Sequence, residues 1–197
     1  MIKLFNKWDT TGIQIADPGL KNYINLKQVI VPRSAGQHAK NRFWRTKSHI
    51  VERLISKLQV AGHRAKKHKV TSGRTTGKYE TIYKIVLKTL EIIEEKTKQN
   101  PVAVLVKAIE NAAPREEITT IEYGGARYPQ AVDCSPLRRI DFVLRMMAQG
   151  SYQKSFKSKK SISQCLADEI MKAYTMDNTS NSIAKKLEVE RQADSSR

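Results

Sequence analysis

Hydrophobic residues recur at helical spacing through most of the chain after residue 48. Apolar side chains at every third or fourth position mark the buried face of an amphipathic helix. The pattern predicts six helices, with approximate ranges 48–62, 78–98, 101–113, 136–150, 161–174 and 182–191. The last has only Ile183 and Leu187 as apolar anchors, so we expect it to be mostly solvated. The sequence therefore predicts a mainly α protein with one helical core.

One segment departs from this periodicity. Residues 118–133, "ITTIEYGGARYPQAVD", are rich in Thr, Ile, Tyr and Val and have Gly124-Gly125 at their centre. Two glycines between two such runs suit the tight turn of a β-hairpin, where positive φ is required. Pro129 is compatible, because both strands of a two-stranded ribbon are edges. We expect a protruding hairpin with Arg127 and Tyr128 near its tip.

The first 45 residues lack a clean period of either kind. Pro18-Gly19 and Pro32 interrupt them, and the short apolar patches "IKLF" and "YINLKQVIV" could be strands or anchors. We interpret residues 1–45 as an irregular N-terminal extension that contributes little to the core. The remaining residues, 46–197, then form the helical domain that carries the hairpin.

The charge of the chain indicates the kind of partner. Lys and Arg number 36 against 19 Asp and Glu, which gives a formal net charge of +17. Such an excess favours binding to a polyanion, a nucleic acid or a membrane surface. The sequence shows no signal peptide and no stretch near the roughly 18 apolar residues of a membrane span. Cys134 and Cys165 fit no ligand pattern, and we expect free thiols in the cytoplasm.

Basic residues gather in two segments. From residue 40 to 78 there are twelve Lys and Arg and one acid, Glu52. This density is typical of phosphate binding. The candidates for RNA contact in this segment are Arg42, Arg45, Lys66, Lys67, Lys69, Arg74 and Lys78. The second segment, 152–161, interleaves Tyr152 and Phe156 with the candidates Lys154, Lys157, Lys159 and Lys160. Aromatic side chains among basic ones could stack on unpaired bases. They could equally pack into the core, and for Phe156 we favour the core.

The start of the fourth predicted helix has an unfavourable charge. Ser135 suits the N-cap and Pro136 the first helical position. Arg138 and Arg139 follow, where the helix dipole is already positive and acids are preferred. A phosphate at this helix end would make both arginines favourable. The alternative is that they pair with nearby acids such as Asp133 or Asp141.

The chain offers little for catalysis or metal binding. "GRTTGKY" at 73–79 has three residues between its glycines where a nucleotide-binding loop needs four, and Tyr79 replaces the hydroxyl residue. His63 and His68 lie among lysines and arginines, without the further ligands of a zinc site. No Ser or Cys lies in a nucleophile motif. The sequence predicts no catalytic residues, no cofactor, no metal site and no enzymatic activity.

Several motifs resemble one known family. "HIVERLI" (49–55), "NPVAVLVKAIENAAPRE" (100–116), "QAVDCSPLRRID" (130–141) and "SISQCLADEI" (161–170) resemble small-subunit ribosomal protein seven of the universal nomenclature, in its archaeal–eukaryotic branch. The C-terminal "LEVERQADSSR" also fits that branch. Gly77-Lys78 matches the glycine and first basic residue of the family signature, whereas Tyr79 replaces its second basic residue. The resemblance covers nearly the whole chain.

The resemblance implies about six helices with a protruding hairpin. It implies binding to the 3′ major domain of small-subunit rRNA, in the head, by a protein that nucleates head assembly beside neighbouring ribosomal proteins. It also implies a hairpin close to the exit-site tRNA and the mRNA exit channel. By position, Arg115, Arg127, Arg138 and Arg139 correspond to basic residues expected near RNA.

Two other classes of protein stay open from the residues alone. A stand-alone DNA-binding protein would present base-reading side chains on one exposed helix face. Here the basic residues lie mostly in loops and at helix ends. An enzyme acting on RNA would need positioned acid–base groups or a metal, and we find neither pattern.

Overall fold

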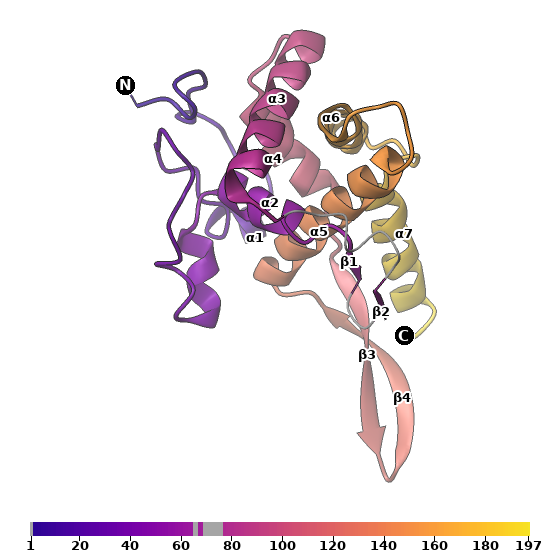
Figure 1. Cartoon of the computed structure of the whole chain (residues 1–197). Helices are drawn as coiled ribbons and strands as arrows, with labels where there is room; N and C mark the ends of the chain where they lie inside the picture. The colour runs from indigo at the N-terminus through magenta and orange to yellow at the C-terminus, as the bar shows by residue number, and fades with distance from the viewer. Residues whose placement is uncertain (1, 65–66, 69–76) are drawn as a thin grey trace.

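The computed structural model describes residues 2–64, 67–68 and 77–197, and it is mainly helical (Figure 1). The elements in chain order are α1 (Pro18–Lys21), the 3₁₀ helix η1 (Arg42–Lys47), α2 (Ile50–Leu58), β1 (His63–Arg64), β2 (Lys67–His68), α3 (Tyr79–Thr97), α4 (Pro101–Ala112), β3 (Glu116–Tyr123), β4 (Ala126–Asp133), α5 (Pro136–Ser155), α6 (Ile162–Tyr174) and α7 (Asn181–Asp194). The six predicted helices are confirmed as α2 to α7. The short helices α1 and η1 lie in the N-terminal segment and at its end.

Side-chain caps fix where several helices begin. The Asn100 side chain accepts a hydrogen bond from the Val102 N–H at 3.0 Å, and Pro101 occupies the first helical position. At α6, Ser161 and Gln164 form a reciprocal capping box. Each of these arrangements satisfies N–H groups that the helix itself leaves without partners.

Helix α5 continues past Gly150, where we expected it to end, to Ser155. Gly150 is buried against α7: a Cβ at this position would lie 2.8 Å from the Cβ of Asn181. The Asn181 amide also donates to the carbonyl of Met146 at 2.8 Å. Gly150 is therefore a point of close helix approach, and its lack of a side chain serves packing here instead of ending a helix.

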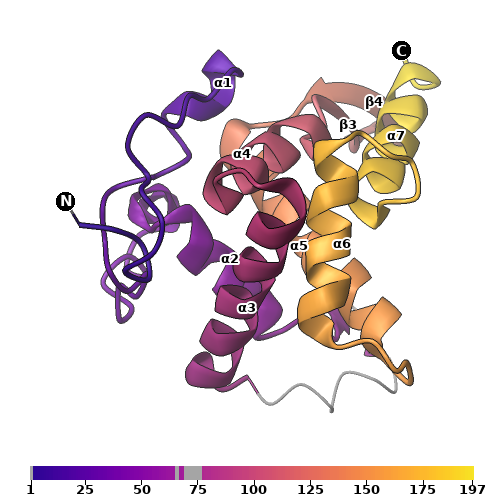
Figure 2. The same cartoon turned by 90° about the horizontal axis from the view of Figure 1, so that it is seen from above.

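Helix α6 lies at the centre of the fold and packs against α3, α4, α5 and α7 (Figure 2). Its inner face includes Leu166 and Ile170, which are fully buried. In helix α7, Ile183 is buried as expected, but Leu187 is exposed and Ala193 is the second buried apolar residue. Among the described residues, no helix has the length and apolar composition needed to cross a membrane.

The N-terminal segment contributes to the core, and the expectation that it contributes little is wrong. Its buried core residues are Leu4, Phe5, Trp8, Leu20 and Ile24. Trp8 also donates from its indole N–H to Glu94 of α3 at 2.9 Å. The local pattern failed because these anchors lie in an isolated β-bridge, a turn, the four-residue helix α1 and irregular chain. Burial in such short elements depends on distant partners and leaves no period in the sequence. The boundary at residue 45 itself stays a prediction.

The hairpin of β3 and β4 is confirmed, with strands slightly longer than the sequence indicated. Glu116 pairs with Asp133 at the base and Tyr123 with Ala126 at the tip. Gly124 and Gly125 have φ of 58° and 82°, as the turn requires. Figure 1 shows the ribbon projecting away from the helices, and β3 contacts α7 near its base.

The basic segment 63–78 lies largely outside the described residues. Where it is described, His63–Arg64 and Lys67–His68 form a second, very short antiparallel pair. At the far end of the segment, Lys78 occupies the N-cap position of α3 without a capping side-chain bond.

Candidate nucleic-acid interface

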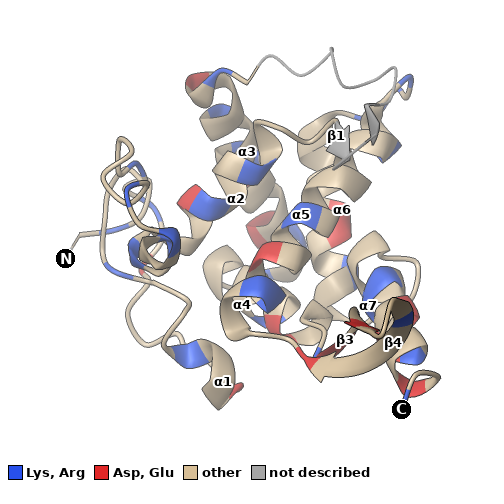
Figure 3. Cartoon of the chain, turned by 90° about the horizontal axis from the view of Figure 1, so that it is seen from below, with Lys and Arg blue, Asp and Glu red and all other residues tan. Residues whose placement is uncertain are grey.

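Most of the described candidate residues are exposed. They come from η1, the hairpin, and the ends of helices and the loops that follow them. Figure 3 shows Lys and Arg of the whole described chain in blue, spread over several helices and the N-terminal segment. The exposed candidates are Arg42, Arg45, Lys78, Arg115, Arg127, Tyr128, Arg138, Lys154, Lys157, Lys159 and Lys160. Lys66, Lys69 and Arg74 lie outside the described residues, and for Lys67 only the strand position in β2 is described. Among the candidates whose burial the structure describes, Arg139 alone is buried.

Helix η1 presents aromatic and basic side chains together. Phe43 is 70 % exposed, which is unusual for a large apolar residue. Arg42 and Lys47 lie over the rings of Phe43 and Trp44, with cation-to-centroid distances of 6.0 and 4.2 Å. Exposed aromatic rings beside cations can stack on unpaired bases while the cations bind phosphate.

Arg139 is buried, and its guanidinium bonds to groups within the protein. Its Nε donates to the carbonyl of Pro114 at 2.9 Å, and its Nη2 lies 2.7 Å from Asp17. Burial alone would raise the pKa of Asp17, but the hydrogen bonds from Arg139 and Gly19 outweigh it and the pKa is lowered. The guanidinium thus connects the N-terminal segment with the residue just before the hairpin. Because Arg139 is buried and paired within the protein, we do not include it in the proposed RNA-binding surface.

Arg138 points outward and pairs with Glu117 of β3. Its side chain is 62 % exposed, so this pair is weak and open to exchange for a phosphate. The expected acid partners, Asp133 and Asp141, pair with neither arginine among the described residues. Ser135 does occupy the N-cap position, but its side chain makes no capping hydrogen bond. The N–H groups of this helix end are therefore not satisfied by the predicted hydroxyl.

Lys154 is engaged with a buried carboxylate. Its ammonium lies 2.7 Å from Glu169, whose side chain is fully buried. Glu169 also accepts from the Ser180 hydroxyl and the Ser182 N–H, at 2.8 and 3.0 Å. This network joins α5, α6 and the start of α7. Lys157, Lys159 and Lys160 lie beyond α5 and are exposed.

The hairpin has one apolar and one charged face. Ile121 is opposite Tyr128 in the ladder, and Tyr123 follows Ile121 on the same face. These side chains are 44 %, 58 % and 82 % exposed respectively. On the opposite face, Arg127 lies 3.5 Å from Glu122, an exposed pair that costs little to break. The ribbon therefore offers aromatic rings to one side and a cation to the other.

Sequence reasoning missed the acidic residues that organise the basic ones. Asp141 accepts from Arg45 and Arg53 at 3.1 and 3.2 Å, and Lys57 lies 3.7 Å away. No local pattern marks Asp141, because its partners come from η1 and α2. The sequence did hint that Glu169 is buried, since this acid lies three residues after Leu166 on the apolar side of α6.

The titratable groups of the described residues show no sign of a reactive centre. Burial raises the pKa of Cys134 to about 11, and Glu117 reinforces the shift. Burial also raises the pKa of Cys165. Thiols of this kind are poor nucleophiles. Within the described ranges, no three His, Cys, Asp or Glu side chains cluster as metal ligands would.

Basic side chains on a helical core, exposed aromatic residues beside them and a projecting ribbon define a protein of the nucleic-acid-binding class. The family model described as "Ribosomal protein S7p/S5e" matches residues 20–197. The chain therefore belongs to this ribosomal protein family, which is not a family of enzymes. The family resemblance noted in the sequence is confirmed.

The chain also aligns with curated relatives over nearly their full length. The chain is 54 % identical to the small ribosomal subunit protein uS7 of Nanoarchaeum equitans, over all of this chain and 99 % of that protein. It is 48 % identical to the protein of the same name from Methanosphaera stadtmanae, over 97 % of this chain and 96 % of the relative. The counterpart from Methanothrix thermoacetophila is 44 % identical over the whole of both chains.

Proposed function

We propose that the chain is a structural protein of the small ribosomal subunit, acting in the cytoplasm, and that it binds the 3′ major domain of the rRNA in the head. The observation that carries this is the exposed set of basic residues on η1, the hairpin and the ends of helices. These positions surround a helical core on several sides, as suits a folded RNA that wraps the protein. A single recognition helix for duplex DNA would instead gather such residues on one face.

In this account the protein nucleates head assembly and holds rRNA segments together, next to other small-subunit proteins. Its phosphate contacts come from residues whose acid partners, in the described part of the chain, are absent or weak. Arg42, Lys157, Lys159 and Lys160 are exposed, and Arg138 is held only by a surface pair. Such side chains exchange a weak partner for phosphate at little cost.

The hairpin serves the exit-site region in this proposal. Its aromatic face, with Tyr123 and Tyr128, and the cation of Arg127 suit contact with the exit-site tRNA and the mRNA leaving the subunit. The exposure of these rings supports the proposal, because they add nothing to the core of the free protein.

Binding of the full chain to a head-domain rRNA fragment tests the proposal. We expect tighter binding to this fragment than to a 5′-domain rRNA fragment or a duplex DNA of equal length. Affinity for the head fragment should fall steeply and linearly with the logarithm of salt concentration. Equal affinity for all three nucleic acids at moderate salt would contradict a specific rRNA function and favour a general polyanion binder.

A further inference from the structure

A groove of about 460 Å³ lies between η1, α2 and the loop before them. Its charged lining comprises Arg42, Arg45, Arg53, Lys57, Glu52 and Asp141, and His38 also lines it. Four basic residues against two acids leave an excess of two positive charges. The serines at 34, 48 and 56 line the same groove and add hydroxyl groups.

Asp141 is shared by three of these cations. Arg45, Arg53 and Lys57 all lie within 3.7 Å of its carboxylate. Burial alone would raise the pKa of Asp141, but Lys57 and Arg53 outweigh it and the pKa is lowered. Asp141 is thus a carboxylate, and one negative charge cannot balance three positive ones.

Glu52 does not supply the missing charge. It is directed to the loop, where it accepts from the N–H and the hydroxyl of Ser34 at 2.7 and 2.6 Å. No ion pair between Glu52 and a described basic residue is present. The groove therefore keeps its positive excess although it contains two acids.

The cations differ in their freedom to move. Arg53 is 5 % exposed and fixed by its bonds to Asp141 and the carbonyl of Tyr23. Lys57 is partly exposed, and Arg45 is 60 % exposed. Burial lowers the pKa of Lys57, and Arg45 adds to this effect against the opposing effect of Asp141. An added anion would relieve this crowding, because each cation favours a negative neighbour.

We infer that this groove is a binding site for one RNA phosphodiester, held by Arg45 and Lys57 over the fixed pair of Arg53 and Asp141. The inference rests on the proposed rRNA binding and adds a specific site to it. Arg53 and Asp141 act as positioning residues that hold the two mobile cations at the groove. The concave wall concentrates the positive potential. Of the serines in the groove, Ser34 and Ser56 already donate to Glu52, so the Ser48 hydroxyl is the one that can donate to a phosphate oxygen.

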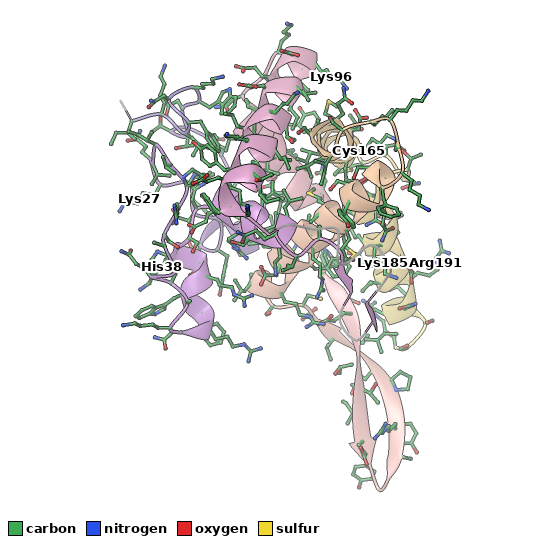
Figure 4. All side chains as sticks on the ribbon, in the orientation of Figure 1. Lys27, His38, Lys96, Cys165, Lys185 and Arg191 are labelled. Carbon is green, nitrogen blue, oxygen red and sulfur yellow. The ribbon has the colours of Figure 1, made fainter. Side chains whose placement is uncertain are left out.

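The test compares two double variants of the full chain that remove equal charge. Arg45→Gln with Lys57→Gln empties the groove of its mobile cations. The control, Lys7→Gln with Lys96→Gln, removes two cations paired with Glu91 and Asp168. Lys96 lies far from His38 and the groove (Figure 4). Binding to the head-domain rRNA fragment is measured across a salt series.

We expect the groove variant to lose about tenfold or more in affinity. The slope of log affinity against log salt should shrink by roughly one for the lost phosphate contact, and less in the control. Equal losses in both variants would overturn the groove site while leaving rRNA binding intact. Absence of specific rRNA binding by the unchanged chain would overturn the proposed function and the site with it.

A single variant keeps the test informative if the double variant does not fold. Arg45→Gln alone changes an exposed side chain and should leave thermal unfolding unchanged. We expect it to reduce affinity more than Lys96→Gln alone, in the same salt series. If it reduces affinity no more than that control, the groove holds no phosphate.

Discussion

Arg139 and Asp17, 122 positions apart in the sequence, form an ion pair with an Nη2–Oδ2 distance of 2.7 Å. The same guanidinium donates to the Pro114 carbonyl just before the hairpin. One side chain thus joins the N-terminal segment, the end of α4 and the start of α5. The sequence suggested a phosphate ligand for Arg139, and the structure gives it an internal one.

Replacing Arg139 should therefore destabilise the free protein. We expect Arg139→Gln to lower the free energy of unfolding by about 2–4 kcal/mol, because it leaves Asp17 and the Pro114 carbonyl without their donor. Arg138→Gln, the adjacent change at an exposed surface pair, should cost less than about 1 kcal/mol. Urea unfolding of both variants measures the difference. Equal effects would contradict the division into a structural and a surface arginine.

The N-terminal segment should stabilise the helical core. Trp8 is 4 % exposed and its indole donates to Glu94. We expect Trp8→Ala to cost about 3–5 kcal/mol, comparable to Leu54→Ala in α2. Thermal and urea unfolding provide the measurement, with Ile2→Ala, at an exposed position, as control. A change in stability no larger than in the control would mean that residues 1–45 are an independent extension after all.

Shortening the hairpin should leave the fold intact. Residues 120–129 are exposed and lie beyond the base that contacts α7. Replacing them with a short Gly-Ser link should preserve cooperative unfolding and binding to head-domain rRNA. Function at the exit site should suffer, seen as weaker tRNA retention by small subunits carrying the variant. Loss of cooperative unfolding would instead show that the ribbon supports the core.

His49 should make stability depend on pH. It caps α2 by accepting from the Val51 N–H, and burial lowers its pKa to about 4. In the unfolded chain its pKa is about 6.5. Between these values the unfolded state binds the extra proton, so stability falls as pH decreases from 6.5 towards 4. At pH 5 the loss should be about 2 kcal/mol relative to neutral pH.

The variant His49→Asn isolates this effect. Asparagine can accept the same capping hydrogen bond but does not titrate in this range. Its unfolding free energy should change less between pH 7 and 5 than that of the unchanged chain. His38→Asn, a partly exposed position in the loop before η1, should preserve the original dependence. The same pH dependence in all three proteins would exclude His49 as its source.

The sequence predicted the helices and the hairpin because these depend on local signals. Apolar spacing marked α2 to α7, and Gly124-Gly125 marked the turn of the hairpin. The burial of Trp8 and Arg139 and the pairing of Arg139 with Asp17 were missed, because each depends on a partner distant in sequence. Charge counting found the basic candidates but could not tell which of them are exposed and which are engaged inside the protein. It did not distinguish the exposed Arg138 from the buried Arg139. It also did not distinguish Lys154, which pairs with the buried Glu169, from Lys157.

The groove shows the same limit. Arg42 and Arg45 were recognisable as basic, but the sequence does not reveal that Asp141 would gather Arg45, Arg53 and Lys57 around one carboxylate. Such clusters form by packing of separate elements, so composition gives the net charge while the fold decides where it remains uncompensated.

The central claim, that the chain is a constituent of the small ribosomal subunit, is tested most directly by sedimentation. The tagged full chain, expressed in its own cells, is followed through a sucrose gradient at a salt concentration that removes loosely bound proteins. We predict that it co-sediments with small subunits and with assembled ribosomes in a constant ratio to the rRNA. Recovery at the top of the gradient, or uniform spread along nucleic acid of every size, would contradict the account.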